Sequence, residues 1–272
     1  MKGRISSMGP NATPSGGRDT ASQFHEMAAR YASSVPHSSG ESLRILGSFA
    51  RGQRYRKALD VATGPGFTAF EVAPLCDHVV ATDPALGMLA EVERLAAERG
   101  IGNVATEQAY AESLPFEDGE FDLVTCRTAP HHFTDLPLAI REMRRVLEPG
   151  GTLILVDTVA DEDREIAAWQ NEMEARRDTT HVRDLPPSEW QSLLAETGFE
   201  IEQEAMTTVD MELDSWLERS GTPPEEGERL REEWAAAPDA VKGAFRIQPS
   251  GDPAGRNFSF SWPVYVCRAR RR

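Results

Sequence analysis

The segment from Lys57 to Gly66, KALDVATGPG, constrains the fold more than any other part of the chain. Its short apolar run predicts a strand that is covered on both faces, as in a parallel sheet. Gly64 and Gly66 predict a tight turn directly after this strand, and an apolar helical pattern begins at Phe67. The unpaired N–H groups at the start of such a helix suit the polar or anionic part of a nucleotide-like ligand.

Asp60 lies inside the same predicted strand. A carboxylate among buried apolar neighbours costs several kcal/mol unless it is hydrogen-bonded or paired. We therefore expect Asp60 to have a fixed partner close to the ligand.

Strand and helix patterns alternate through the middle of the chain. The expected strands after the glycine turn cover residues 78–82, 103–108, 121–127, 151–157, 199–211 and 258–267. Helical patterns separate most of these strands, and a mostly helical insertion over 213–245 precedes the last one. This alternation predicts an α/β fold with a doubly wound, mostly parallel sheet of seven strands, whose ligands bind at the carboxyl ends of the strands.

The sequence divides into four expected regions. Residues 1–20 are rich in Gly, Pro, Ser and Thr and predict a disordered tail. Residues 21–52 predict helices that cap the ligand site as a lid, and residues 53–160 predict the cofactor-binding core. Residues 161–272 are expected to complete the sheet and to supply helices on the substrate side.

The net charge and the distribution of apolar residues argue against nucleic-acid and membrane partners. The 272 residues carry a formal net charge of -15, which repels nucleic-acid backbones and anionic membrane surfaces. The three cysteines, Cys76, Cys126 and Cys267, lack CxxC spacing. The chain also shows no apolar window long enough for a membrane span and no signal-peptide core in its first twenty residues. We expect a cytoplasmic protein that binds neither nucleic acid nor membrane. The protein could form a homodimer.

The glycine turn carries a cofactor pattern. Residues 64–69, GPGFTA, match G-x-G-x-x-G/A, and Asp83 follows at the end of the second strand, where a ribose-binding acid is expected. Dinucleotide-dependent enzymes share this pattern. The combination of Asp60, the turn that begins at Thr63, and the segment 83–89, DPALGML, is more selective.

With these features the sequence resembles the class I S-adenosylmethionine-dependent methyltransferases. The resemblance extends from about Phe24 to the last strand and rests on LDVATGPG, VVATDPALGML, AESLPFEDGEFDLVTCRTAPHHFTD and REMRRVLEPGGTLILVD. It is strongest to the type 11 branch that includes the ubiquinone and menaquinone C-methyltransferases. It implies S-adenosyl-L-methionine as cofactor and in-line methyl transfer to a carbon, oxygen, nitrogen or sulfur nucleophile of a small-molecule acceptor.

The resemblance also implies roles for individual residues at the cofactor. Asp60 would face the amino group of the methionine part, Asp83 would accept hydrogen bonds from the ribose hydroxyls, and Met88 would pack on the adenine. The segment Ala111-Glu112 would recognise the adenine edge, although Tyr110 stands where relatives commonly carry an aspartate. The complete set of expected cofactor-binding residues is Tyr31, Asp60, Thr63, Gly64, Gly66, Asp83, Pro84, Met88, Ala111, Glu112 and Arg127.

Structural interpretations of several of these residues stay open. Gly64 and Gly66 could merely form a tight turn, and Met88 could be an ordinary core residue. Asp83 could cap the helix that follows Pro84, and Arg127 could form a structural ion pair.

Methyl transfer from a sulfonium needs alignment, and it needs a base only if the acceptor must lose a proton. The candidates for orienting the acceptor or taking its proton are His131, His132, His181 and Arg183. Each of these histidines could instead be a satisfied structural residue. The six histidines show neither HExxH nor Cys/His ligand spacing, so no metal is expected.

Two other functions remain alternatives. The protein could be a catalytically inactive S-adenosylmethionine-binding partner or sensor, which would keep the same cofactor motifs. A nicotinamide-dependent oxidoreductase shares the glycine turn, but it gives no reason for Asp60 or for the 84–88 segment, and no Tyr-x-x-x-Lys pair is present.

Overall fold

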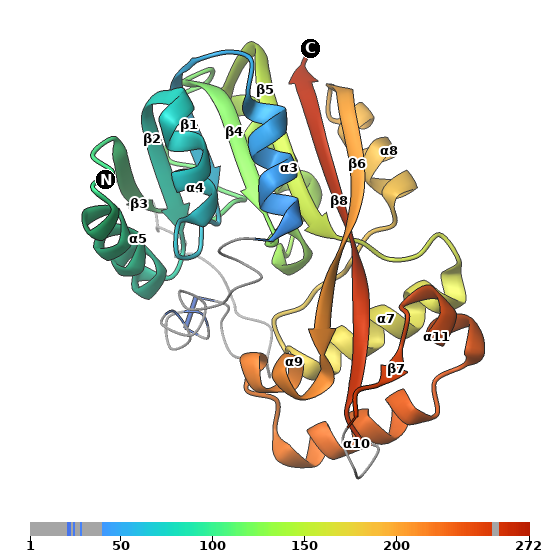
Figure 1. Cartoon of the computed structure of the whole chain (residues 1–272). Coiled ribbons are helices and arrows are strands. Elements are labelled where there is room, and N and C mark those ends of the chain that lie inside the picture. Colours follow the sequence, from blue (N-terminus) through green and yellow to red (C-terminus); the bar gives the residue numbers. More distant parts are fainter. Residues whose placement is uncertain (1–20, 23, 25–27, 29–39, 252–255) are drawn as a thin grey trace, which may run out of the picture.

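The computed structural model describes residues 21, 22, 24, 28, 40–251 and 256–272. A twisted sheet with helices on both faces forms the larger part, and a smaller group of helices surrounds the far ends of two long strands (Figure 1). The expected disordered tail, Tyr31 and most of the first lid helix lie outside the described residues.

The sheet has the expected mixed order. From one edge to the other its long strands are β3 (Val104–Gln108), β2 (Cys76–Asp83), β1 (Tyr55–Val61), β4 (Phe121–Arg127), β5 (Leu147–Thr158), β8 (Phe258–Arg271) and β6 (Phe199–Glu212). The first five run parallel, whereas β8 is antiparallel to both β5 and β6. A two-residue strand, β7 (Gln248–Pro249), pairs with the start of β8. The prediction of a doubly wound, mostly parallel sheet with seven long strands is confirmed.

Helices cover both faces of the sheet. One face carries α3 (Glu41–Ala50), α4 (Phe67–Val72) and α5 (Leu86–Arg99), and the other carries α6 (Leu136–Val146) and α8 (Pro187–Glu196). Two short 3-10 turns, η1 (Ala73–Leu75) and η2 (Pro130–His132), lie between these elements and the strands. The strands β1 and β4 are therefore buried on both sides, which explains their continuous apolar runs.

A second core lies away from the sheet's main body. The helices α7 (Arg164–Arg177), α9 (Leu213–Ser220), α10 (Pro224–Ala235) and α11 (Asp239–Ala244) surround the extended ends of β6 and β8 (Figure 1). Its largest fully buried side chains are Trp216, Trp234, Trp262, Phe245 and Phe260. The insertion expected over 213–245 is thus three helices, because Gly221 (φ 67°) ends α9 and prolines precede both α10 and α11.

Helix boundaries follow local capping chemistry. The Asp135 carboxylate accepts a hydrogen bond from the Leu138 N–H at 2.9 Å at the start of α6. Asp163 caps α7 in the same way, so this helix begins at Arg164. No helix within the described residues is long and apolar enough to cross a membrane.

Candidate functional site

The two glycines of the turn between β1 and α4 have different surroundings. A Cβ atom added to Gly64 (φ +54°) would meet nothing within 4 Å, so open space lies beside this residue. A Cβ atom added to Gly66 (φ +90°) would lie 2.9 Å from the Phe70 ring. Gly64 therefore leaves room for a ligand, whereas Gly66 is required for close packing against α4.

Asp60 has the fixed partners that the sequence leads us to expect. It is 1% exposed, and its carboxylate accepts hydrogen bonds from Thr63 Oγ1 at 2.5 Å and from Thr125 Oγ1 at 2.7 Å. Burial raises the pKa of Asp60 to about 6, although the two hydroxyls and the charge of Arg127 oppose this shift. Thr125 is the register partner of Asp60 on β4, which explains their contact.

Arg127 lies at the end of β4 beneath the glycine turn. Its Nε donates a hydrogen bond to Thr68 Oγ1 at 3.0 Å. Burial lowers the pKa of Arg127 to about 10, and the nearby charge of Asp60 limits this shift. The side chain therefore ties β4 to α4, and a cofactor contact through its backbone stays a prediction.

Asp83 joins the glycine turn to the start of α5. Its Oδ2 accepts a hydrogen bond from the Gly64 N–H and its Oδ1 accepts one from the Ala85 N–H, both at 2.9 Å. Burial raises the pKa of Asp83 to about 6. Asp83 does not cap α5, because the N-cap residue is Ala85 and no side chain caps this helix; the Asp83 oxygen accepts the hydrogen bond of the Ala85 N–H instead. Each carboxylate oxygen can accept a further hydrogen bond. The carboxylate thus holds the backbone of Gly64, the residue whose Cβ direction is open.

Residues from the N-terminal segment contact both sides of this region. Ala28 packs on Ala85 and on Met88, which is 2% exposed, and the Phe24 ring lies 5.2 Å from the His132 ring in an edge contact. These contacts agree in position with a lid. Pro84, which the resemblance places on the adenine together with Met88, is half-buried, and its carbonyl accepts a hydrogen bond from Gln108 Nε2 at 2.8 Å.

The segment Ala111-Glu112, expected at the adenine edge, packs into the core through Ala111 and contacts the loop before α6 through Glu112. Ala111 is buried in the main core. The Glu112 carboxylate accepts hydrogen bonds from the Thr134 N–H at 3.0 Å and from the Thr134 hydroxyl at 3.1 Å. The side chain of Tyr110 is 51% exposed. The carboxylate of Glu112 thus supports the loop at Thr134, and an adenine contact from this segment stays a prediction.

Three histidines meet at the carboxyl ends of β4 and β5. His131 and His132 lie in η2, and His181 comes from the loop between α7 and α8. The His131 ring centroid lies 4.2 Å from that of His132 and 5.7 Å from that of His181. The chain therefore brings together three of the four residues that the sequence nominates for the acceptor side.

His132 and His181 are neutral. His132 Nδ1 lies 3.1 Å from the Thr180 carbonyl oxygen, and His181 Nε2 lies 3.1 Å from Asn171 Oδ1. Burial, together with the charge of His131, lowers the pKa of His132 to about 3 and that of His181 to about 2. Neither ring is in the imidazolium form at neutral pH.

His131 is the exception, because Asp157 binds it at two points. One Asp157 oxygen accepts a hydrogen bond from the His131 N–H at 2.9 Å, and the other lies 2.6 Å from Nδ1. Burial alone would lower the pKa of His131, but the Asp157 charge and hydrogen bond outweigh it and raise the pKa to about 9. His131 is therefore an imidazolium at neutral pH.

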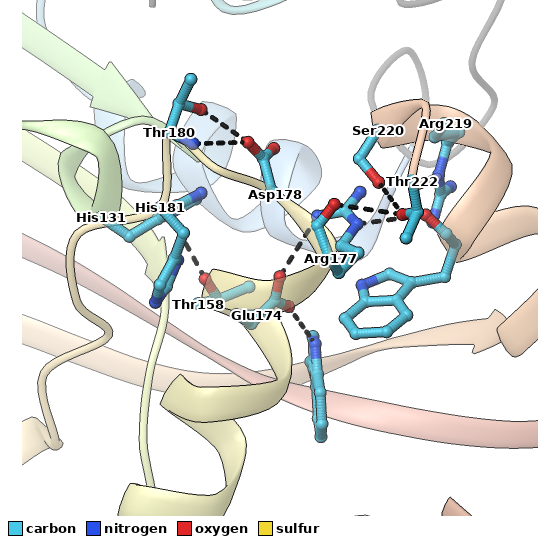
Figure 2. Close-up of polar contacts among 12 residues, drawn as sticks. His131, Thr158, Glu174, Arg177, Asp178, Thr180, His181, Arg219, Ser220 and Thr222 are labelled. Carbon is cyan, nitrogen blue, oxygen red and sulfur yellow. Dashed lines mark hydrogen bonds and ion pairs between the residues drawn. The ribbon is translucent and has the colours of Figure 1, made fainter. Parts of the chain in front are cut away.

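A buried polar network supports this pair from behind. Thr158 Oγ1 lies 3.4 Å from His131 Nδ1 and donates a hydrogen bond to Asp184 Oδ1 at 2.7 Å. Burial raises the pKa of Asp184 to about 7. Figure 2 shows this region with Glu174 next to it, whose carboxylate pairs with Arg177 at 3.2 Å. Asp184 was not predicted as a site residue from the sequence, because nothing in the residues around Asp184 distinguishes it from an exposed loop residue.

Arg183 lies apart from the histidine rings. Its guanidinium is 53% exposed and forms an ion pair with Glu189 on α8 at 2.8 Å. Its backbone N–H and that of Val182 both donate to the His131 carbonyl oxygen, at 3.2 and 2.8 Å. Within the described residues Arg183 thus contributes to the histidine cluster through its backbone, and a role for its side chain stays a prediction.

The acceptor-side cluster also contains a group that could be considered for a metal. Ligand atoms of His131, Asp157 and Asp184 lie within 4.8 Å of one another. The 2.6 Å contact between His131 and Asp157 is a hydrogen bond, and both Asp184 oxygens already accept hydrogen bonds, one from Thr158 and one from Gln170. These contacts describe a hydrogen-bonded network, and the expectation of a metal-free site stays a prediction.

Comparison with known proteins agrees with the fold and with the position of the glycine turn. Residues 59–155 match the methyltransferase domain family. The chain is 33% identical over 224 residues to the uncharacterized methyltransferase YcgJ of Bacillus subtilis, which covers 82% of this chain and 88% of that protein. The crystal structure of YcgJ superposes with a TM-score of 0.78 at 32% identity and covers 85% of this chain and 98% of YcgJ.

A shorter match supports the expected branch. The ubiquinone/menaquinone biosynthesis C-methyltransferase UbiE of Cellvibrio japonicus is 37% identical over 145 residues, or 50% of this chain and 58% of that protein. The match to YcgJ extends over most of both chains in sequence and in structure. The chain belongs to the class I S-adenosylmethionine-dependent methyltransferases.

Proposed function

We propose that this protein transfers the methyl group of S-adenosyl-L-methionine to a small-molecule acceptor. The observation that carries the proposal is the arrangement at Gly64, where a Cβ atom would meet open space and where the Asp83 carboxylate accepts a hydrogen bond from the backbone N–H. Family membership supports the cofactor, because this turn is where related enzymes hold it.

The residues at the turn fit the parts of this cofactor. Asp83 would accept hydrogen bonds from the ribose hydroxyls with the lone pairs that Gly64 and Ala85 leave free. Asp60 would attract the ammonium group of the methionine part, since its carboxylate lies below the turn and is ionised above pH 6. Met88 and Ala85 would offer an apolar surface to the adenine once Ala28 moves aside.

The cofactor supplies an activated methyl group, so the protein must chiefly align the acceptor with it and exclude water. The histidine cluster lies at the ends of β4 and β5, next to β1 and its glycine turn in the sheet order. We assign the acceptor to this side. Phe24 would border the acceptor and Ala28 the cofactor, because Phe24 contacts His132 and Ala28 contacts Met88.

Isothermal titration of the full chain with S-adenosylmethionine, S-adenosylhomocysteine and NAD tests the cofactor without knowledge of the acceptor. We expect saturable binding of both adenosyl ligands and none of NAD. Binding of NAD alone would contradict the proposal in favour of an oxidoreductase.

An acceptor screen that follows release of S-adenosylhomocysteine then separates an enzyme from a sensor. We expect release that depends on the acceptor. Tight cofactor binding without release for any acceptor class would favour the sensor.

A further inference from the structure

His131 is held more firmly than a histidine in a surface loop usually is. Its backbone N–H and its Nδ1 both bond to the Asp157 carboxylate, and its carbonyl oxygen accepts hydrogen bonds from two successive N–H groups, those of Val182 and Arg183. Asp157 itself is 1% exposed on β5. The ring orientation is therefore fixed by β5 on one side and by the loop before α8 on the other.

The second ring nitrogen of His131, Nε2, differs from Nδ1 in its surroundings. His131 Nε2 has no hydrogen-bond partner among the described residues, and it does not belong to the fully buried polar atoms. The side chain keeps 12% of its surface exposed. Because Asp157 occupies Nδ1, an incoming molecule can reach the imidazolium only through its Nε2–H.

Three carboxylates face His131, each from a different part of the chain. Asp157 and Asp184 face it from β5 and from the loop before α8, and Glu174 faces it from α7, where Arg177 already pairs with that carboxylate. The neighbouring imidazoles of His132 and His181 are neutral. Asp157 is thus the one carboxylate hydrogen-bonded to His131, and the outward Nε2–H of the ring remains a positively charged donor.

This donor lies close to the proposed cofactor site. The Phe24 ring contacts His132, and Ala28 contacts Met88 at the start of α5. The two contacts come from residues four positions apart in the chain, and the histidines of η2 follow β4, which pairs with β1, the strand that leads into the glycine turn.

We propose that the Nε2–H of His131, oriented by Asp157, binds an anionic oxygen of the methyl acceptor, so that the acceptor is an organic acid. The anionic oxygen belongs to a carboxylate or to an ionised phenol or enol, since both present the same charged acceptor to an N–H donor. His131 is then a binding residue for the acceptor, and Asp157 is a positioning residue that acts through it. This inference rests on the proposed function, because it concerns the acceptor side of the same site.

Nuclear magnetic resonance of the histidine ring protons in the full chain, saturated with S-adenosylhomocysteine, tests the proposal at the atom concerned. The His131 signal is assigned by its loss in His131→Gln. The probes are benzoate, 4-nitrophenolate at pH 8, and uncharged nitrobenzene. We expect a saturable shift of the His131 signal with at least one anion and none with nitrobenzene. A benzoate response indicates a carboxylate acceptor, and a response to nitrophenolate alone indicates a phenol or enol.

Asp157→Asn should weaken anion binding at least tenfold and move the titration of His131 to lower pH. Asp122→Asn is the matched control, because Asp122 likewise makes two hydrogen bonds, in its case with the backbone N–H groups of Arg56 at 2.7 Å and Lys57 at 3.0 Å, at the opposite end of β4. Its effect on anion binding should be less than twofold.

The three-probe titration uses the unmodified chain and needs a variant, His131→Gln, only for the signal assignment. It therefore tests the inference even if Asp157→Asn does not fold. An equal response to nitrobenzene, or no response to either anion, would overturn the inference. Failure of S-adenosylhomocysteine to bind in the preceding calorimetry would instead contradict the proposed function, so the two failures are distinguishable.

Discussion

Replacement of Asp83 by alanine should separate a cofactor contact from a structural one. The carboxylate bonds to the N–H groups of Gly64 and Ala85, both at 2.9 Å, and would also receive the ribose hydroxyls. Loss of one hydrogen bond to a charged group costs about 1.5–3 kcal/mol, which corresponds to a rise of about 10- to 150-fold in the Kd for S-adenosylhomocysteine. The two N–H groups left without a partner should lower the free energy of unfolding by about 1–3 kcal/mol.

Calorimetry gives the Kd, and urea unfolding gives the free energy of unfolding. Asp77→Ala is the matched control, because Asp77 lies on the same strand but is 57% exposed and pairs only with Arg54 at 2.9 Å. Its Kd should not change, and its stability should change by no more than about 1 kcal/mol. If Asp83→Ala folds and binds S-adenosylhomocysteine within twofold of the unmodified chain, the placement of the ribose at Asp83 is wrong.

Three further predictions concern the same turn. Gly64→Val should abolish cofactor binding in calorimetry, whereas Gly100→Val, at another left-handed glycine (φ +65°) with nothing within 4 Å of its Cβ, should reduce stability to a similar extent and leave binding intact; equal binding by both would contradict the open space assigned to the ligand. Gly66→Ala should lower the free energy of unfolding by about 1–3 kcal/mol, because its Cβ would lie 2.9 Å from an α4 ring carbon, and an unchanged urea midpoint would be evidence against that contact. Since burial raises the pKa values of Asp60 and Asp83 to about 6, both carboxylates are ionised above this pH and become protonated below it, so affinity for S-adenosylmethionine should be full at pH 7–8 and fall towards pH 5; calorimetry that shows no change over this range would exclude the two carboxylates as cofactor ligands.

Local sequence patterns were sufficient for much of the fold. The bounds of β4 agree with the sequence expectation to the residue, and β6 differs from it by a single residue. These elements have clear apolar periods between breaks, and such periods do not depend on distant contacts. The glycine turn was predictable for the same reason, since the change from a strand to a helical pattern occurs within a few residues.

Patterns were less informative where breaks or pairing decide the outcome. The helical insertion was expected as one region, yet Gly221 and the prolines divide it into three helices. Strand β5 begins at Leu147 and not at Gly151, because its early residues pair with β4 across an irregular register. Pairing with a neighbouring strand can extend an element through residues with little intrinsic preference for it.

The sequence by itself determined the sheet, the glycine turn and the acids at the strand ends, because each of these follows from residues that are close together in the chain. Only the tertiary structure decided what those residues touch. It assigned Gly66 to packing and Gly64 to open space, and it placed His181 beside His131 across fifty residues of chain. It also gave His131 a buried carboxylate partner from β5. The charge of an imidazole depends on burial and on neighbours a few ångströms away, and these are set by how strands and loops pack.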